Sequence, residues 1–371
     1  MKAINISFMQ LMQRAIASGN ISAKGYLRLV VYILKSILVI PGSVLQFLFY
    51  SRRIKRTTIT KAPIFILGYY RSGTTLLHKL IASDKQFGFV TYYDIICPNT
   101  ALLFGKPLKK ILQFFVKSFK IKTPFFNDTI PIMDEPAEEE RFLINKASAY
   151  TDYWRFMFPL NWNRWKSVSE QLKDDKFREH WQKEYLSLLK MITYKNSNKQ
   201  LVLKSPPNTE LIKYLLKVFP QAKFIYIHRN PCHLFYSMKN LWCKAIKKYC
   251  VHDISNEQVE EIIFNDYIQL TSQYEKDKCL IPVDHLIEIK YEELEKQPLS
   301  ILKKIYKELN IPGFENAAGY FEKQIEKEKK YQKFQYKFDE DVLKKIERRW
   351  ISNSLKENHK VNMKMNCSCM Q

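Results

Sequence analysis

One short segment, residues 68–75, constrains the fold of this chain more than any other. Its sequence, Gly-Tyr-Tyr-Arg-Ser-Gly-Thr-Thr, follows an apolar run at 64–67 and precedes an apolar helical pattern that starts at Leu76. A glycine-bounded turn between a strand and a helix is typical of phosphate-binding loops. Backbone N–H groups at the start of that helix, together with the helix dipole, favour an anion. The segment therefore predicts an anion site at the end of a strand.

The loop departs from the pattern of nucleotide triphosphatases at one position. Thr74 stands where those enzymes have a lysine that reaches the β- and γ-phosphates, and a cation appears at Arg71 instead. A guanidinium and three hydroxyls surround Gly73, and they come from Arg71, Ser72, Thr74 and Thr75. Arginine adds planar, bidentate donors to such an oxyanion site. We expect this loop to hold a phosphate-like group, but not ATP or GTP.

Three further apolar runs have the length of buried strands. They lie at 200–204, 223–228 and 286–290, and a weaker strand-like stretch covers 87–99. Helical patterns separate them, at 106–120, 137–146, 177–194, 209–219 and 237–247. Apolar runs linked by helices predict parallel strands with helices on both faces. The expected fold is α/β, a P-loop-like three-layer doubly wound parallel sheet with extra helices.

Cations and hydroxyls follow the other strands of the predicted sheet as well. Lys204 ends the second strong strand, Arg229 follows the third, and Ser237 lies about two turns into the next helix. Ligands of such sheets bind at the carboxyl ends of the strands, so the three loops are candidates for one shared site. Two anion sites on one edge suggest a ligand with phosphates at opposite ends of a nucleoside. No strand ends in the carboxylate that a P-loop nucleotidase uses for Mg²⁺, so a metal-free transfer is expected.

In these motifs the chain resembles the sulfotransferase family that uses 3′-phosphoadenylyl sulfate as donor. The motifs are residues 68–77, 203–206, 227–231 with Ser237, and 291–294, and their order and separation match. Arginine in the first loop makes the chain similar to the bacterial and protein-tyrosine branches. The glycine-rich C-terminal motif of the cytosolic branch is absent, which leaves residues 329–337 as a candidate for closing over the donor.

The resemblance implies a role for each of these residues. Arg71 to Thr75 would hold the 5′-phosphosulfate, Arg229 and Ser237 the 3′-phosphate, and Tyr291 would belong to the same donor site. Lys204 would neutralise charge on the bridging oxygen as the sulfuryl group leaves. Preorganised cations aimed at developing charge are usually the largest catalytic contribution. The co-substrate would be 3′-phosphoadenylyl sulfate, without a metal.

The residue that would take a proton from the acceptor is less clear from the sequence. The glutamate that the protein-tyrosine branch uses is absent, and Asp94 is the nearest carboxylate to its place. The other candidates are Glu138 and Glu140, which flank Glu139 at an expected helix start. Acidic residues at a helix N-terminus are also favoured by the dipole alone, so capping and catalysis both remain open. The catalytic candidates are therefore Lys204, Glu138, Glu140 and Asp94.

The composition indicates which partners suit the chain. The formal net charge is +23, which favours anionic partners. Nucleic acid is not expected, because the basic residues are spread along the chain without a recognised binding motif. The aromatic segment 150–166 could form a core or line a pocket for a small-molecule, lipid or glycan acceptor. Seven scattered cysteines favour a reducing compartment, and hence the cytoplasm.

The N-terminal region differs from the rest of the chain. Residues 26–50 are strongly apolar, but their longest uncharged run, 36–50, has fifteen residues, fewer than the roughly 20 that span a bilayer. Basic residues follow at 52–56, so the segment either lies on an anionic membrane surface or packs as a helix pair on the domain. We expect an apolar-basic region at 1–56, a sulfotransferase-like domain at 57–358 and a flexible tail at 359–371. A peripheral position on the inner face of the membrane would fit this division.

Two other functions compete with sulfuryl transfer. A P-loop nucleotide kinase-like phosphotransferase would need a lysine in place of Thr74 and a carboxylate for Mg²⁺. A non-catalytic, anion-binding protein at a membrane would not need the cations and hydroxyls of all three loops.

Overall fold

A parallel sheet forms the centre of the computed structural model. The structure describes residues 12–19, 21–38, 40–122, 130–145, 151–161, 167–329 and 336–351. The strands are β1 (Ile64–Leu67), β2 (Phe87–Gly88), β3 (Gln200–Lys204), β4 (Lys223–His228) and β5 (Leu286–Lys290). All pairings are parallel, in the order β2-β3-β1-β4-β5. The predicted α/β fold is confirmed, and β1, β3, β4 and β5 have the expected bounds.

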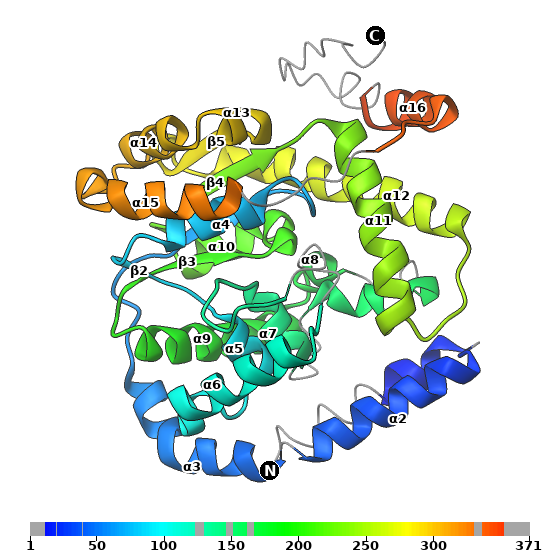
Figure 1. Ribbon diagram of the computed structural model, residues 1–371, viewed down its shortest axis with the longest axis horizontal. Coiled ribbons are helices and arrows are strands. Elements are labelled where there is room, and N and C mark those ends of the chain that lie inside the picture. The colour runs from blue at the N-terminus through cyan, green and yellow to red at the C-terminus, as the bar shows by residue number, and fades with distance from the viewer. Residues whose placement is uncertain are drawn as a thin grey trace.

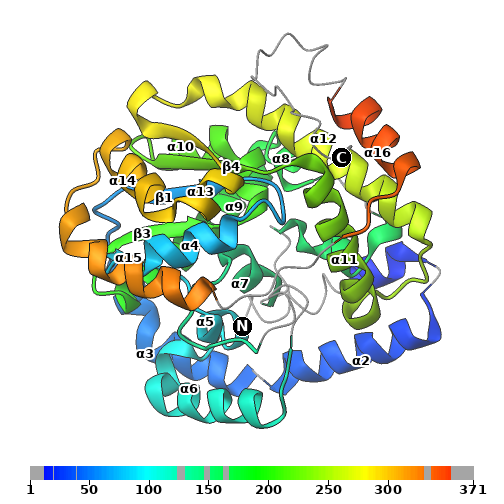
Figure 2. The ribbon, with the colours of Figure 1, turned by 45° about the horizontal axis from the view of Figure 1, so that its top comes forward.

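Helices cover both faces of the sheet, as the central strand β1 requires, because all four of its residues are apolar and buried. In β1, Ile64 and Ile66 pack on one side, and Phe65 and Leu67 pack on the other. The first side meets α4 (Thr74–Ala82), α13 (Tyr291–Lys296), α14 (Pro298–Glu308) and α15 (Phe314–Lys329). The second side meets α7 (Glu139–Asn145), α9 (Asp175–Lys195) and α10 (Ile212–Val218). Figure 2 shows the resulting three layers.

A third apolar cluster lies beside the sheet, on the right in Figure 1. It joins α11 (Pro231–Tyr249), α12 (Asn256–Asp277) and α16 (Glu340–Ile346). Phe235 and Trp242 of α11 are fully buried in it, and the Trp350 indole donates a hydrogen bond to the Phe264 carbonyl over 3.1 Å. The cluster fixes α11, the helix that carries Ser237.

Two predicted elements differ from the structure. The stretch 87–99 contains only the two-residue strand β2, and α5 (Tyr92–Ile96) follows it. Thr91 caps α5, because its hydroxyl accepts from the Asp94 N–H while the Asp94 carboxylate accepts from the Thr91 N–H. The helix predicted at 209–219 begins later, as α10, because Pro206 and Pro207 open a 3₁₀ turn, Pro206–Glu210, before it.

The N-terminal region forms two helices, α2 (Ala23–Leu38) and α3 (Ile40–Arg56), and both contact the rest of the chain. Leu29 of α2 packs in a buried cluster with Trp154 and Phe158, two members of the aromatic segment 150–166. Tyr150, Trp162 and Trp165 of that segment lie outside the described residues. Among the described helices, none is long and apolar enough to cross a membrane.

Candidate active site

The loop after β1 has the geometry of an anion cradle. Arg71 and Gly73 adopt positive φ angles of 70° and 101°, which turn the chain into the start of α4. Gly73 caps α4 without a side-chain hydrogen bond, so the first-turn N–H groups of Thr74 and Thr75 have no acceptor within the helix. A Cβ atom at Gly73 would lie 2.2 Å from Cδ2 of Tyr291, so this turn requires glycine.

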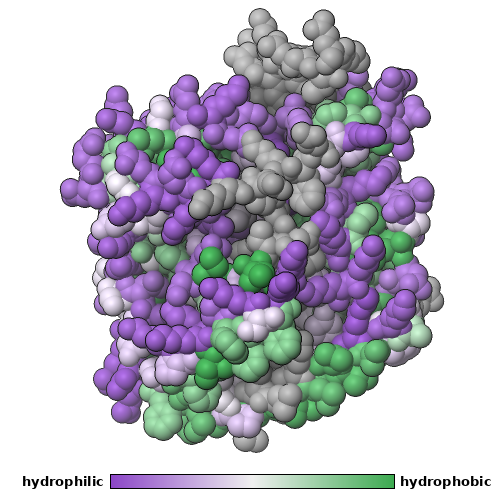
Figure 3. Space-filling model, viewed as in Figure 1, coloured by the Kyte–Doolittle hydropathy of each residue, from purple (hydrophilic) through white to green (hydrophobic). Residues whose placement is uncertain are grey.

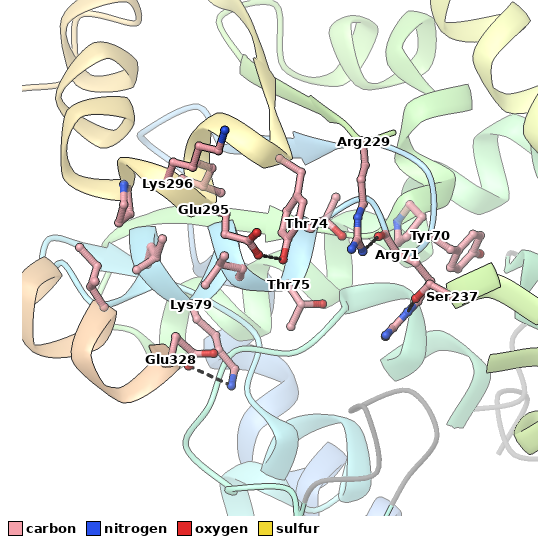
Figure 4. Close-up of a pocket in the computed structure, with 18 of the residues that line it drawn as sticks. Tyr70, Arg71, Thr74, Thr75, Lys79, Arg229, Ser237, Glu295, Lys296 and Glu328 are labelled. Carbon is pink, nitrogen blue, oxygen red and sulfur yellow. Dashed lines mark hydrogen bonds and ion pairs between the residues drawn. The ribbon is translucent and has the colours of Figure 1, made fainter. Parts of the chain in front are cut away.

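A cavity of about 330 Å³ opens on this loop. Because β1 lies between β3 and β4, the loops after all three strands meet at its walls, as the sequence predicted. Figure 4 shows side chains from α4, α11, α13 and α15 around it. Of the predicted site residues, Arg71, Gly73, Thr74, Thr75, Glu138, Arg229, Ser237 and Tyr291 line the cavity.

The two predicted anion-binding groups adjoin each other. The Arg71 Nε–H donates to the Ser237 Oγ over 2.9 Å, and an Arg229 N–H donates to the Arg71 carbonyl over 3.2 Å. The Arg229 guanidinium lies over the Tyr291 ring, 4.4 Å from its centroid. Figure 4 shows Arg71, Arg229 and Ser237 together on one side of the cavity. The structure thus places a dense group of cations and hydroxyls where the first and third loops meet.

Lys204 ends β3 and lies behind the cavity wall, where it contacts two lining residues, Thr75 and Glu138. Its Nζ lies 3.3 Å from the Thr75 Oγ1 and forms an ion pair with the Glu138 carboxylate. Its side chain is only 4% exposed, so it is held rather than mobile. Burial lowers the pKa of Lys204, against the attraction of Glu138. The structure thus places a lysine from a neighbouring strand beside the first loop, which itself has none.

Glu138 is the carboxylate that lines the cavity beside this lysine. It accepts hydrogen bonds from the Lys204 ammonium and from the Tyr153 hydroxyl. Burial alone would raise its pKa, but the charges of Lys204 and Arg141 and these two hydrogen bonds outweigh burial and lower it. Its side chain remains 15% exposed. Glu138 is therefore an ionised carboxylate within reach of a ligand in the cavity.

The two neighbouring glutamates have structural partners. Glu139 accepts from the Lys204 backbone N–H over 3.0 Å and from the Asn208 amide. Glu140 accepts from the Thr151 hydroxyl over 2.9 Å and from the Asp152 N–H over 2.6 Å. Both are buried, and burial raises the pKa of each. Glu139 thus fixes the strand end that carries Lys204, whereas Glu140 orders the segment that carries Tyr153.

The structure does not bring Asp94 to the cavity. It is completely buried, caps α5 and forms an ion pair of 2.5 Å with Lys195. Ser72 also turns away from the cavity walls and lies buried at the base of the loop, where its Oγ has no hydrogen-bond partner within the described residues. Asp94 is close in sequence to the first helix, but it does not supply a carboxylate to this site, and Ser72 does not supply a hydroxyl.

Sequence reasoning missed several residues of the site. In the sequence Tyr153 is one of several aromatic residues at 150–166, and no sequence pattern links it to Glu138, fifteen positions away. Lys79 lines the cavity, 3.2 Å from Glu328 of α15, and only its place one turn after Thr75 could have indicated this. Of the segment 329–337, expected to close over the donor, Lys329 and Tyr336 line the cavity, and 330–335 lie outside the described residues.

Comparison with known proteins agrees with this geometry. The sequence profile of the Sulfotransferase family matches residues 63–316. The omega-hydroxy-beta-dihydromenaquinone-9 sulfotransferase of Mycobacterium bovis is 27% identical over 277 residues, which cover 73% of this chain and 68% of that protein. The same enzyme of Mycobacterium tuberculosis matches equally.

Two solved structures share the fold. Sulfotransferase STF9 of Mycobacterium avium superposes with a TM-score of 0.69 at 16% identity, over 94% of this chain and 96% of that one. Sulfotransferase STF1 of Mycobacterium tuberculosis gives 0.68 at 16% identity, over 87% of each chain. With the match to the family profile over most of its length, the chain belongs to the sulfotransferase family, and it transfers a sulfuryl group to an acceptor.

Proposed function

We propose that the cavity binds 3′-phosphoadenylyl sulfate as the sulfuryl donor. The observation that carries the proposal is the meeting of the α4 N-terminus with Arg71, Arg229 and Ser237 at one end of the cavity. The N–H groups and hydroxyls of Thr74 and Thr75 would hold the 5′-phosphosulfate. Arg229 and Ser237 would hold the 3′-phosphate, and Arg71, which contacts Ser237, would lie between the two anionic groups.

The proposed reaction is an in-line displacement at sulfur. The acceptor hydroxyl oxygen forms a bond to sulfur while the bond between sulfur and the bridging oxygen breaks. Lys204 stabilises the negative charge on that oxygen, and adenosine 3′,5′-bisphosphate leaves. The hydroxyl proton passes to the Glu138 carboxylate, which the Tyr153 hydroxyl orients. Glu138 is favoured over Asp94 and Glu140 because, of the three, it alone lines the cavity.

The acceptor we propose is a lipid-like alcohol. The mycobacterial relatives act, by their names, on omega-hydroxy-beta-dihydromenaquinone-9, an acceptor that carries a hydroxyl group. Apolar side chains also face the cavity, including Leu76, Leu80 and Ile325. The cytoplasmic side of a membrane would suit such an acceptor. In agreement with a reducing compartment, no disulfide joins the cysteines that the structure describes.

Isothermal calorimetry with adenosine 3′,5′-bisphosphate tests the donor site. We expect binding without Mg²⁺ and a loss of about 10- to 100-fold in affinity for Arg71→Ala and for Arg229→Ala, since each removes charge-assisted hydrogen bonds. Arg348→Ala, which changes an exposed arginine outside the cavity, is the control and should bind normally. Full affinity in Arg71→Ala would refute the site, and Mg²⁺-dependent ATP binding would favour a kinase instead.

A further inference from the structure

Helix α3 reverses the usual arrangement of a surface helix, in which apolar residues face the protein and polar residues face water. The single residue of α3 that is buried is polar Gln46, whereas Phe47, Leu48 and Phe49 are 63%, 66% and 64% exposed. Gln46 accepts from the Leu102 N–H over 2.8 Å, at the start of the next helix along the surface. Large apolar side chains normally face inward, so this reversal leaves a surface that water does not favour.

Helix α2 shows the same outward pattern. Its inner side is held by Leu29 and by Arg28, whose guanidinium donates to backbone carbonyls at the end of α11. Its outer side exposes large apolar residues at helical spacing, each at least 42% exposed: Tyr26, Leu27, Val30, Val31, Leu34 and Ile37. Packing on the domain and exposure of an apolar stripe therefore occur together, on opposite sides of one helix.

A third helix, α6 (Ala101–Ser118), extends this surface, although the sequence predicted only a basic helix there. It contacts α3 and exposes Phe104, Ile111, Phe114 and Phe115, and Phe119 follows it, 70% exposed. We call the exposed apolar residues of α2, α3 and α6, with Phe119, the apolar face. Figure 3 shows apolar side chains along the lower margin of the molecule, where Figure 1 places these three helices. Large exposed apolar patches mark interaction surfaces.

Charge indicates what covers the apolar face. The chain has no aspartate or glutamate before Asp84, and none between Asp94 and Asp128. The three helices lie within these stretches, and they contain three basic residues in α2, four in α3 and four in α6. Apolar side chains beside cations, on helices that contain no acidic residue themselves, complement an anionic lipid surface. A second copy of the chain would bring the same positive charge against itself, which opposes a symmetric dimer.

We propose that the apolar face docks on an anionic phospholipid bilayer, with α2, α3 and α6 lying in its interface. The phenylalanines and leucines would enter the acyl boundary, while Arg52, Arg53 and the lysines of α6 would contact lipid phosphates. Each basic residue near such a surface strengthens binding, and the exposed apolar side chains of the three helices supply the apolar area. The docking itself stands apart from the identity of the acceptor.

A short segment connects the apolar face to the active site. Helix α6 holds residues 130–136 through Gln113, which accepts from the Met133 N–H over 2.8 Å, and through an ion pair of Lys109 with Asp134. Ile132 in this segment is 46% exposed and extends the apolar surface. Glu138 follows two residues after it ends.

Flotation of the full-length protein with vesicles tests the docking. The two vesicle types are phosphatidylcholine alone and equal parts of phosphatidylcholine and phosphatidylglycerol. We expect binding to the mixed vesicles, weakened by high salt, and binding at least about tenfold weaker to phosphatidylcholine alone. The double variants Phe47→Ser/Leu48→Ser and Phe114→Ser/Phe115→Ser should each lose about tenfold or more, since two large apolar groups no longer leave water.

The controls separate docking from folding and from catalysis. Val283→Ser removes an apolar side chain that is 98% exposed elsewhere on the surface, and it should float as the wild type does. Failure of the wild-type protein to float, or unchanged flotation of both double variants, would overturn the proposal. So would a dimer in solution that Phe47→Ser/Leu48→Ser dissociates. Binding of adenosine 3′,5′-bisphosphate without vesicles is measured in parallel, because its loss would refute the donor site and leave the docking standing.

Discussion

Two regions depart from the usual pattern of burial, in opposite ways. Charged side chains are buried beside the cavity at the edge of the sheet, whereas large apolar side chains are exposed on the apolar face of α2, α3 and α6. At the cavity, the side chains of Lys204 and Glu138 are 4% and 15% exposed. On the apolar face, Phe47, Phe49 and Phe114 are more than half exposed, whereas Gln46 of the same region is buried. Neither arrangement favours stability on its own, since charges prefer water and apolar groups avoid it. Chains retain such features where function requires them, so the contrast separates a region for chemistry from a region for contact.

The largest effect on the cavity side is expected from Lys204→Met. Removing the cation near the breaking bond should lower kcat by about 10³-fold. Vesicle flotation should stay unchanged, because Lys204 is buried far from any lipid contact. Steady-state transfer of labelled sulfate to a soluble alcohol measures the rate, and calorimetry with the bisphosphate checks that the donor site survives. A variant that keeps most of its activity would show that the cation for the leaving oxygen comes from elsewhere.

A second change on the cavity side is Glu138→Gln, which keeps the shape of the side chain and removes the proton acceptor. We expect kcat to fall by about 10²-fold or more. Asp94→Asn is the matched control, because Asp94 is buried in a helix cap away from the cavity. It should lose stability but keep kcat. The opposite result, an active Glu138→Gln and an inactive Asp94→Asn, would move the base to Asp94.

On the apolar face the expected effect is on stability rather than on rate. Gln46→Leu leaves the Leu102 N–H without its acceptor, and we expect the free energy of unfolding to fall by about 1–3 kcal/mol. Leu48→Ser, at an exposed position two residues away, should change it by less than about 0.5 kcal/mol. Urea unfolding measures both. A larger loss in Leu48→Ser than in Gln46→Leu would mean that the apolar face is packed against protein.

The smallest expected effect is a shift in pH dependence for Tyr153→Phe. The base must be ionised, so activity falls as the pH drops through the pKa of Glu138, which its surroundings lower. The Tyr153 hydroxyl donates a hydrogen bond that favours the ionised form. Its removal raises the pKa of Glu138, so the acidic limb of the kcat profile should move to higher pH. If the acidic limb of the kcat profile does not move, the Tyr153 hydroxyl does not influence the pKa of the base.

The sequence predicted the sheet well and the base poorly, for a physical reason. The strands from Ile64 and Gln200 are short, apolar and bounded by glycine or charge, which are local signals. The meeting of Arg71, Arg229 and Ser237 followed from parallel topology, which sends all strand ends to one edge. By contrast, the partners of Glu138 come from a strand end and from an aromatic turn far away in the chain. The exposure of the apolar residues of α3 could not be predicted either, because an apolar stripe has the same sequence pattern whether it faces a core or a membrane.

The ion pair of Lys204 with Glu138 has a consequence for kinetics. On the proposed assignment, one ammonium group cannot serve the glutamate and the bridging oxygen of the donor equally. When the nucleotide attracts Lys204, Glu138 loses its cation and becomes a better proton acceptor. An acceptor alcohol that arrived first would meet a weaker base. A single side chain would then make the strength of the base depend on the presence of the nucleotide, whichever substrate binds first.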